Sequence, residues 1–288
     1  MGAELYRIIS TPKRAIRWYQ KIRWRKGLCC PRCGVLRQSI RHQQFENGLR
    51  KYFCKACGHH YSDTTGTIFH NSKVPLWKWL LAIFEMSQPS SISAMELSKK
   101  LTLSYPTTLR MHQKIRLLLA NKYEDDEDKK LGGTIEADEA WFGHKAEQDV
   151  VQGLVSRNGD LRLTPLAGLE EVDLQDGVSC YIKRGSLLFT DGRAGYGNVH
   201  LVHQTVNHSK GEYVSFTDRN VHTNTIEQIW GMMKGILRTV HHGVTKKWRY
   251  SYLYSFACKY NYRYLPNLFT FMVDLSTQPK LCPTIALQ

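Results

Sequence analysis

The chain has 288 residues, with 40 Lys or Arg against 25 Asp or Glu, so its formal net charge is +15. This length is enough for two or three domains with a sizeable core, and a hydrophobic fraction of 42% excludes a mostly disordered chain. No apolar run reaches the roughly 18 residues that cross a bilayer, and residues 1–10 lack the core of a signal peptide. We therefore expect a soluble intracellular protein with no membrane partner, whose positive charge favours nucleic acid.

Two Cys-x-x-Cys-Gly motifs stand in the N-terminal region, residues 1–72. Their cysteines are Cys30, Cys33, Cys54 and Cys57. Each motif predicts a tight turn that directs two thiolates toward one point, so the two turns together complete a site for one structural Zn²⁺. The residues between them read as strand, turn and strand, which predicts a zinc ribbon over about residues 28–62. Cys29 offers another register, but Cys30 has the correct spacing; a disulfide framework is the alternative that a reduced compartment disfavours.

Residues 73–122 read as helices. A short amphipathic helix with apolar residues from Ala94 to Leu101 is followed by a tight turn and then by a longer helix. This pattern resembles a DNA-binding helix-turn-helix, whose second helix would lie in the major groove. The side chains expected to face bases or phosphates are Thr107, Thr108, Arg110 and Lys114. The alternative is an ordinary helical bundle with a solvated polar face.

An acidic, highly charged run follows, and we expect residues 123–131 to be a solvated linker. Residues 132–275 then read as one mixed α/β domain, with residues 276–288 as a tail. The expected elements are strands at 134–143, 150–157 and 161–167, a helix at 170–182 and a strand at 186–192. The last strand is short and apolar and ends in an aspartate, as a buried central strand would.

Three acids in this domain are candidate metal ligands. They are Asp138, Asp191 and Glu227. Isolated carboxylates in buried strands are costly, and they become tolerable where they converge on divalent cations. Singly, Asp191 could be a turn residue, and Glu227 could cap a helix that begins at Asn224. Glu136 and Glu139 are rivals of Asp138 within the same strand.

The third acid lies on an expected amphipathic helix. At helical spacing, Glu227 shares one exposed stripe with Lys234 and Arg238. Such a stripe could hold a metal at one end and a DNA phosphate at the other.

Six segments give the sequence a specific resemblance. They are Arg23–Gly34, Thr134–Lys145, Thr190–Tyr196, Val206–Tyr213, His222–Lys234 and Tyr260–Arg263. Together they resemble bacterial insertion-sequence transposases of the DDE superfamily, in particular the ISXO-like group with an N-terminal zinc ribbon. The segments V-N-H-S-K-G-E-Y and H-T-N-T-I-E-Q-I-W are the most distinctive.

The resemblance implies an RNase H-like catalytic domain after the zinc ribbon and the helix-turn-helix. Asp138, Asp191 and Glu227 would hold two Mg²⁺ or Mn²⁺ ions, with Asn224 as a rival for the third position. His222 would join Lys234 and Arg238 in positioning phosphate.

The implied activity is binding of the element's terminal inverted repeats in double-stranded DNA, followed by strand cleavage and transfer into target DNA. A homo-oligomer, at least a dimer on DNA, and a bacterial cytoplasmic, nucleoid-associated location are implied as well. The alternatives are a non-catalytic DNA-binding regulator and a structure-selective nuclease.

Overall fold

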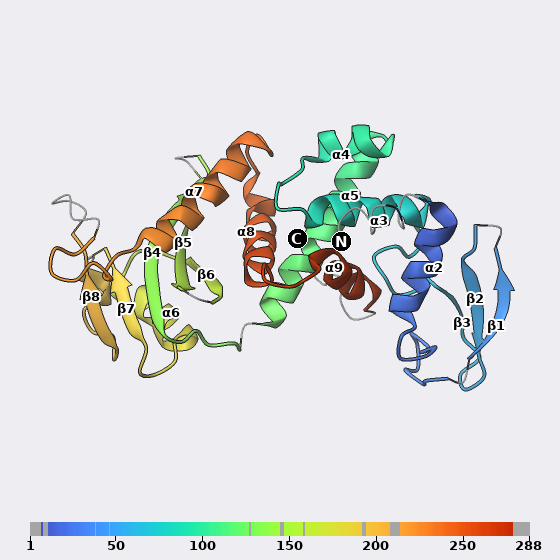
Figure 1. The fold of residues 1–288 in the computed structure, drawn as a ribbon, viewed down its shortest axis with the longest axis horizontal. Helices are drawn as coiled ribbons and strands as arrows, with labels where there is room; N and C mark the ends of the chain where they lie inside the picture. The colour runs from blue at the N-terminus through green and yellow to red at the C-terminus, as the bar shows by residue number, and fades with distance from the viewer. Residues whose placement is uncertain are drawn as a thin grey trace. The chain divides into compact units, whose positions relative to one another are not determined.

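The computed structural model describes a chain of two compact units. The described residues are 7, 11–37, 39–45, 47–126, 128–144, 147–157, 159–191, 194–207 and 214–278. One unit takes its residues from 1–122 and 265–288, and the other from 123–264. Figure 1 labels their helices and strands. Among the described residues, no helix is long and apolar enough to cross a membrane.

The first unit begins with helix α2 (Pro12–Arg23) and a small antiparallel sheet in the order β1-β2-β3. Its strands are β1 (Ser39–Gln44), β2 (Arg50–Cys54) and β3 (His60–Ser62). The strand–turn–strand expectation between the cysteine pairs is therefore confirmed. The buried carboxylate of Asp63 accepts hydrogen bonds from Trp24 Nε1 at 2.8 Å and Gln20 Nε2 at 2.7 Å. It also accepts one from Tyr52 Oη at 2.8 Å, which ties the sheet to α2.

Four further helices belong wholly or mostly to this unit. They are α3 (Leu76–Ser87), α4 (Ala94–Leu101), α5 (Tyr105–Asp125) and α9 (Leu268–Thr277). Ser93 caps α4 by accepting a hydrogen bond from the Glu96 amide at 3.1 Å. In α9, Phe269 stacks on Trp18 of α2, with ring centroids 5.1 Å apart. Helix α9 thus groups with the N-terminal unit, whereas the sequence-based boundary at residue 275 placed it with the α/β domain.

The second unit is a mixed α/β structure around a five-stranded sheet in the order β6-β5-β4-β7-β8. Strands β4, β5 and β6 are antiparallel neighbours, and β7 and β8 continue the sheet parallel to β4. The elements are β4 (Thr134–Phe142), β5 (Asp149–Ser156), β6 (Leu161–Leu166), α6 (Glu171–Tyr181), β7 (Leu187–Thr190), the 3₁₀ turn η2 (Ala194–Tyr196), β8 (Val202–Thr205), α7 (Asn224–Thr239) and α8 (Lys246–Asn261). The five expected elements all form, within two residues of their expected ends.

The two faces of β4 pack against different helices, because side chains alternate between the faces along a strand. On one face, Ile135 and Ala137 are fully buried in a core that includes Leu174 and Val178 of α6. The other face is covered by α7, and it carries Asp138. Opposite Asp138 on β5 stands Gly153, where an added Cβ would overlap the Trp230 ring of α7. Glycine at this position lets α7 approach the sheet closely.

The expected linker at 123–131 is partly helical. Helix α5 continues to Asp125, and the Tyr123 side chain is buried within the second unit. Its hydroxyl accepts a hydrogen bond from the Leu163 amide at 2.6 Å, and its ring stacks on Tyr254. The sequence hid this because one tyrosine before a charged run gives no apolar periodicity.

Candidate functional site

The four cysteines of the two motifs come together in the first unit. Their sulfur atoms all lie within 4.8 Å of one another. Cys30 Sγ is 3.6 Å from Cys57 Sγ, and Cys33 Sγ is 3.8 Å from Cys54 Sγ. Four thiolates at one point form a donor set suited to tetrahedral Zn²⁺. Cys29 stands outside the cluster, so the register beginning at Cys30 is the one that forms.

The backbone around the cluster favours a thiolate at Cys54. Burial raises the pKa of the Cys54 thiol, but the amides of Cys57 and Ala56 donate to its sulfur, and the net result is a pKa lowered to about 6. A thiolate is the form that binds zinc, so the turn prepares this ligand for metal.

In the second unit, Asp138 stands in the middle of β4 under α7. Trp230 Nε1 donates a hydrogen bond to Asp138 Oδ2 at 3.0 Å. The pKa of Asp138 is raised to about 6, first by burial and then by the negative charges of Asp191 and Glu227, against the opposing hydrogen bonds from the Glu139 amide and Trp230. A carboxyl group flanked by like charges is a site that a cation would stabilise.

Asp191 follows β7 directly. Thr134, Ile135 and Glu136 of β4 pair one-to-one with Leu187, Leu188 and Phe189 of β7. Continuing this register by two residues brings Asp191 level with Asp138. The parallel pairing of β4 and β7 thus explains why the negative charge of Asp191 raises the pKa of Asp138.

Glu227 lies in the first turn of α7, where Thr223 Oγ1 donates to Glu227 Oε1 at 2.9 Å. Throughout the described ranges, the four cysteines are the only His, Cys, Asp or Glu set whose ligand atoms all lie within 4.8 Å of one another. Asp138, Asp191 and Glu227 are therefore electrostatic neighbours in a more open arrangement than the cysteines.

Glu136, a rival of Asp138, is fully buried and committed to another task. Its carboxylate accepts hydrogen bonds from the Thr225 amide at 2.7 Å, the Ile226 amide at 3.1 Å and Thr225 Oγ1 at 2.8 Å. Arg157 Nε donates a fourth at 2.7 Å. Glu136 thereby caps α7 from a neighbouring strand. The alternative for Glu227, a capping box with Asn224 as the N-cap, does not form: α7 begins at Asn224, and Thr223 before it makes no side-chain cap.

Glu139, the other rival, points to the opposite face of β4. Its carboxylate accepts a short hydrogen bond from Tyr196 Oη, and Gln152 Nε2 donates to the same hydroxyl at 3.1 Å. Burial and the charge of Glu139 raise the pKa of Tyr196, which therefore stays protonated and donates. The Tyr196 contact ties β4 to the turn that follows Asp191. Sequence reasoning missed this pair and Arg157, although the residues lie inside the motifs or beside them.

The expected phosphate ligands divide into two groups. Lys234 and Arg238 are exposed on α7, with Lys234 Nζ 5.9 Å from the centroid of the Phe142 ring. His222 instead belongs to the cap network: its Nδ1 is 3.4 Å from Glu136 Oε1 and 3.1 Å from Arg157 Nη2.

The helix-turn-helix contacts are corrected at one position. Thr108 is fully buried, and its hydroxyl donates to the Ser104 carbonyl at 3.2 Å, so it cannot reach a base. It lies one turn before the buried His112, on the inner face of α5. Arg110 and Lys114 are exposed one turn apart, and Thr107 is half-buried beside Ser104.

Residues 130–261 match the family described as the ISXO2-like transposase domain. This match lies within the second unit and, together with the relative described next, confirms the resemblance to insertion-sequence transposases. A relative from Halobacterium salinarum, an uncharacterized protein in the transposable element ISH50, is 27% identical over 276 residues, covering 86% of this chain and 90% of the relative.

One chain in the cryo-EM structure of a simian T-cell lymphotropic virus intasome in complex with PP2A regulatory subunit B56 gamma gives a weak structural match. It is 10% identical with a TM-score of 0.29, and the match covers 57% of this chain and 63% of that chain, less than two thirds of its length. A TM-score this low carries no argument about fold or function.

Proposed function

We propose that this protein is a DDE transposase that binds the terminal inverted repeats of its own insertion sequence and catalyses metal-dependent DNA cleavage and strand transfer. The observation that carries the proposal is the position of Asp138. It lies within the residues that match the transposase family, and the negative charges of Asp191 and Glu227 are close enough to raise its pKa. The mixed sheet, a parallel group continued by an antiparallel meander, supports an RNase H-like catalytic domain.

The donor set fits divalent metal. Carboxylate oxygens are the ligands that Mg²⁺ and Mn²⁺ prefer, and the pKa of Asp138 is raised by burial and by the negative charges of Asp191 and Glu227, a setting that a bound cation would stabilise. Asp138, Asp191 and Glu227 would hold the ions, and Asn224, one turn before Glu227, remains the rival for the third position. Two such ions would activate the attacking water or 3′-hydroxyl and stabilise the leaving 3′ oxygen.

The chain's own residues supply position and charge. Trp230 orients Asp138 through its indole N–H. Glu136 holds the first turn of α7, the turn that carries Glu227. Lys234 and Arg238, further along α7, would bind phosphates of the DNA held against the acids. Arg110 and Lys114 on α5 would contact DNA as part of a helix-turn-helix, and the zinc ribbon would add a second DNA-binding element.

The test incubates purified protein with DNA carrying the element's ends, with and without Mg²⁺, and maps the cut positions. We expect Asp138→Asn, Asp191→Asn and Glu227→Gln each to lower cleavage by at least about 10³-fold while end binding is kept. Asn224→Ala tests the rival ligand in the same assay. Glu170→Gln, which removes an exposed carboxylate just before α6, is the matched control and should cleave normally.

Three results would contradict the proposal. Wild-type cleavage by Asp191→Asn would remove the metal-site assignment. Binding of element ends with no Mg²⁺-dependent nicking would favour a non-catalytic regulator. Cleavage of branched DNA regardless of sequence would favour a structure-selective nuclease. End synapsis, measured as a complex of two DNA ends by native mass measurement, tests for the dimer or larger oligomer.

A further inference from the structure

A groove in the first unit, between α2 and the β1–β2 hairpin, is lined by basic residues without an acidic one. Its volume is about 680 Å³. The lining residues with positive charge are Arg17, Lys21, Arg41 and Arg50. The remaining walls are neutral, with Trp24 and Tyr52 forming aromatic surface. Two separate segments of the chain therefore bring four cations to one hollow.

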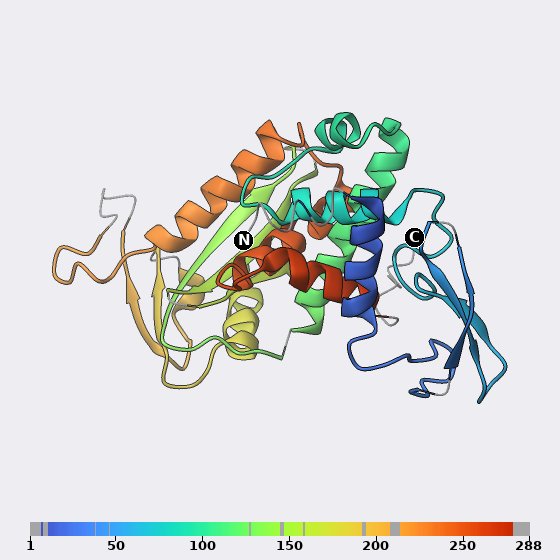
Figure 2. The same ribbon diagram turned by 45° about the vertical axis from the view of Figure 1, so that its right-hand side comes forward.

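The placement of these cations follows from the local structure. Arg17 and Lys21 are one turn apart on α2 and both are exposed, so they share a face of the helix. Arg41 of β1 pairs directly with Tyr52 of β2, and Arg50 lies two residues before Tyr52. Directly paired and alternate residues point to the same side of a sheet, so these side chains share the face of the hairpin that turns to α2. Figure 2 shows α2 beside this hairpin.

The charge of the groove is not neutralised from within. Among the ion pairs of the described residues, none includes any of the four cations, whereas nearby Arg25 pairs with Asp274 at 3.1 Å. The Nε of Arg50 is buried and has no hydrogen-bond partner within the described part of the chain. Asp63 accepts hydrogen bonds from the side chains of Trp24, Gln20 and Tyr52 and from the Arg50 amide, so this one anion lies beside the lining residues, and the ion pairs of the described residues include none between it and the four cations.

A like-charge pair one turn apart destabilises a helix, so Arg17 and Lys21 are not explained by stability. Lys21 and Arg23 lie in the last turn of α2, where positive charge interacts favourably with the helix dipole. This interaction leaves Arg17 and Arg41 unexplained. A ligand with several negative charges would account for all four.

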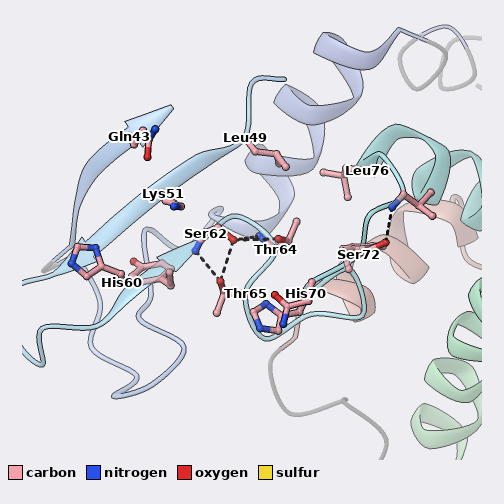
Figure 3. A pocket seen from close by; sticks show the side chains of 14 residues that line it. Gln43, Leu49, Lys51, His60, Ser62, Thr64, Thr65, His70, Ser72 and Leu76 are labelled. Carbon is pink, nitrogen blue, oxygen red and sulfur yellow. Dashed lines mark hydrogen bonds between the residues drawn. The ribbon is translucent and has the colours of Figure 1, made fainter. Parts of the chain in front are cut away.

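A second hollow, on another part of the ribbon, provides a contrast. It has a volume of about 510 Å³ and is lined by Lys51, His60 and His70 among neutral residues. Figure 3 shows that its hydroxyls bond one another: Ser62 Oγ lies 3.2 Å from Thr64 Oγ1 and 3.1 Å from Thr65 Oγ1. With one permanent cation and hydroxyls engaged with each other, this hollow is the weaker anion site.

We propose that the groove between α2 and the β1–β2 hairpin binds the sugar-phosphate backbone of double-stranded DNA. Arginine presents a planar fork that matches phosphate oxygens, and three of the four cations are arginines. Phosphate contacts fix the register of a protein on duplex DNA without reading sequence. This inference rests on the proposed DNA transposase function, and it adds a contact surface separate from both α5 and the carboxylate site.

The test measures binding of the full-length, zinc-loaded protein to a short DNA duplex over a range of salt concentrations, without Mg²⁺. Each phosphate contact contributes about 0.9 to the slope of log K against log salt for duplex DNA. We expect Arg17→Gln/Lys21→Gln/Arg41→Gln to reduce that slope by about 2–3 and to weaken binding at about 0.1 M salt by at least tenfold. Zinc content and circular dichroism should stay at wild-type values, since the three side chains are exposed.

Two controls distinguish the loss of charge in the groove from a change of side chain and from a loss of charge elsewhere in the protein. The charge-preserving variant Arg17→Lys/Lys21→Arg/Arg41→Lys should keep the wild-type slope. Lys183→Gln/Arg184→Gln, which removes two exposed cations from the second unit, should also keep it. An unchanged slope in the neutralised groove variant would overturn the proposal, even if Mg²⁺-dependent cleavage of element ends is intact.

A different partner is also detectable. If the neutralised groove variant loses competition by polyglutamate but keeps duplex DNA binding, the groove docks an acidic polypeptide and the DNA proposal is overturned. Failure of the catalytic assay alone would instead concern the carboxylate site, because DNA binding here is measured without Mg²⁺.

Discussion

Replacing Asp138 with Asn should stabilise the protein while abolishing its proposed activity. The pKa of Asp138 is raised from 3.8 to about 6 in the folded chain, mainly by burial and by the charges of Asp191 and Glu227. An acid whose pKa is higher in the folded state destabilises that state once the pH exceeds the unfolded pKa, so stability falls as the pH rises from about 4 through 6. At about 1.4 kcal/mol per pKa unit, the full shift is worth about 3 kcal/mol at neutral pH.

Asn retains an oxygen that can accept the Trp230 hydrogen bond but carries no charge. Partial solvent access to Asp138 reduces the penalty, so we expect Asp138→Asn to raise the free energy of unfolding by about 1–3 kcal/mol at about pH 7.5. Roughly half of the gain should remain at about pH 5.

Urea unfolding in Mg²⁺-free buffer, with zinc retained, measures the gain at each pH. Added Mg²⁺ should stabilise the wild type, because it binds the folded form, and should stabilise Asp138→Asn much less. A variant that is no more stable than the wild type at about pH 7.5, or a gain that does not shrink toward about pH 5, would refute the electrostatic account of this site.

Three further outcomes follow from other contacts. Glu136→Gln should cost about 2–4 kcal/mol in urea unfolding, because a fully buried carboxylate that caps α7 and pairs with Arg157 loses its charge; an unchanged midpoint would show that the cap is dispensable. Gly153→Ala should cost about 1–3 kcal/mol and weaken Mg²⁺ binding, measured by calorimetry, because its Cβ would displace Trp230 from Asp138. Removing zinc with a chelator should abolish the circular dichroism signal of the β1–β2 hairpin and leave that of the second unit, since the ribbon has little core besides the four cysteines and their aromatic neighbours; a hairpin that persists without zinc contradicts this.

The zinc ribbon could be predicted because its determinants are local. A Cys-x-x-Cys-Gly motif sets the geometry of its own turn, and the sequence between two motifs needs only to form a hairpin. The buried face of α7 was largely predictable for the same reason: Ile226, Trp230, Met233 and Leu237 recur at helical spacing, and the first three are buried whereas Leu237 is half-buried. Strand β8 and helix α2 were not predicted, since a four-residue edge strand with polar side chains and a strongly basic helix give weak periodic signals.

Local sequence pattern does not choose among the three acids of β4, and only the family resemblance singles out Asp138. Alternation separates Glu139 from Asp138, because adjacent residues point to opposite faces, but it leaves Glu136 and Asp138 on the same face. What distinguishes these two is long-range: the amides of α7 and the guanidinium of Arg157 reach Glu136, whereas an indole N–H reaches Asp138. Partners 21 to 92 positions away in the chain cannot be read from local pattern.

These contacts also explain how the acids keep their positions. Helix α7 is attached to β4 at two points, the Glu136 cap on the amides of Thr225 and Ile226 and the Trp230 bond to Asp138. Glu227 lies between these attachments, and its negative charge repels that of Asp138. Like charges would drive the helix from the strand, and the buried cap, which accepts four hydrogen bonds, resists that motion. Glu136 therefore holds α7 against β4, and this attachment keeps Asp138 of the same strand close to Glu227 of the helix despite their repulsion.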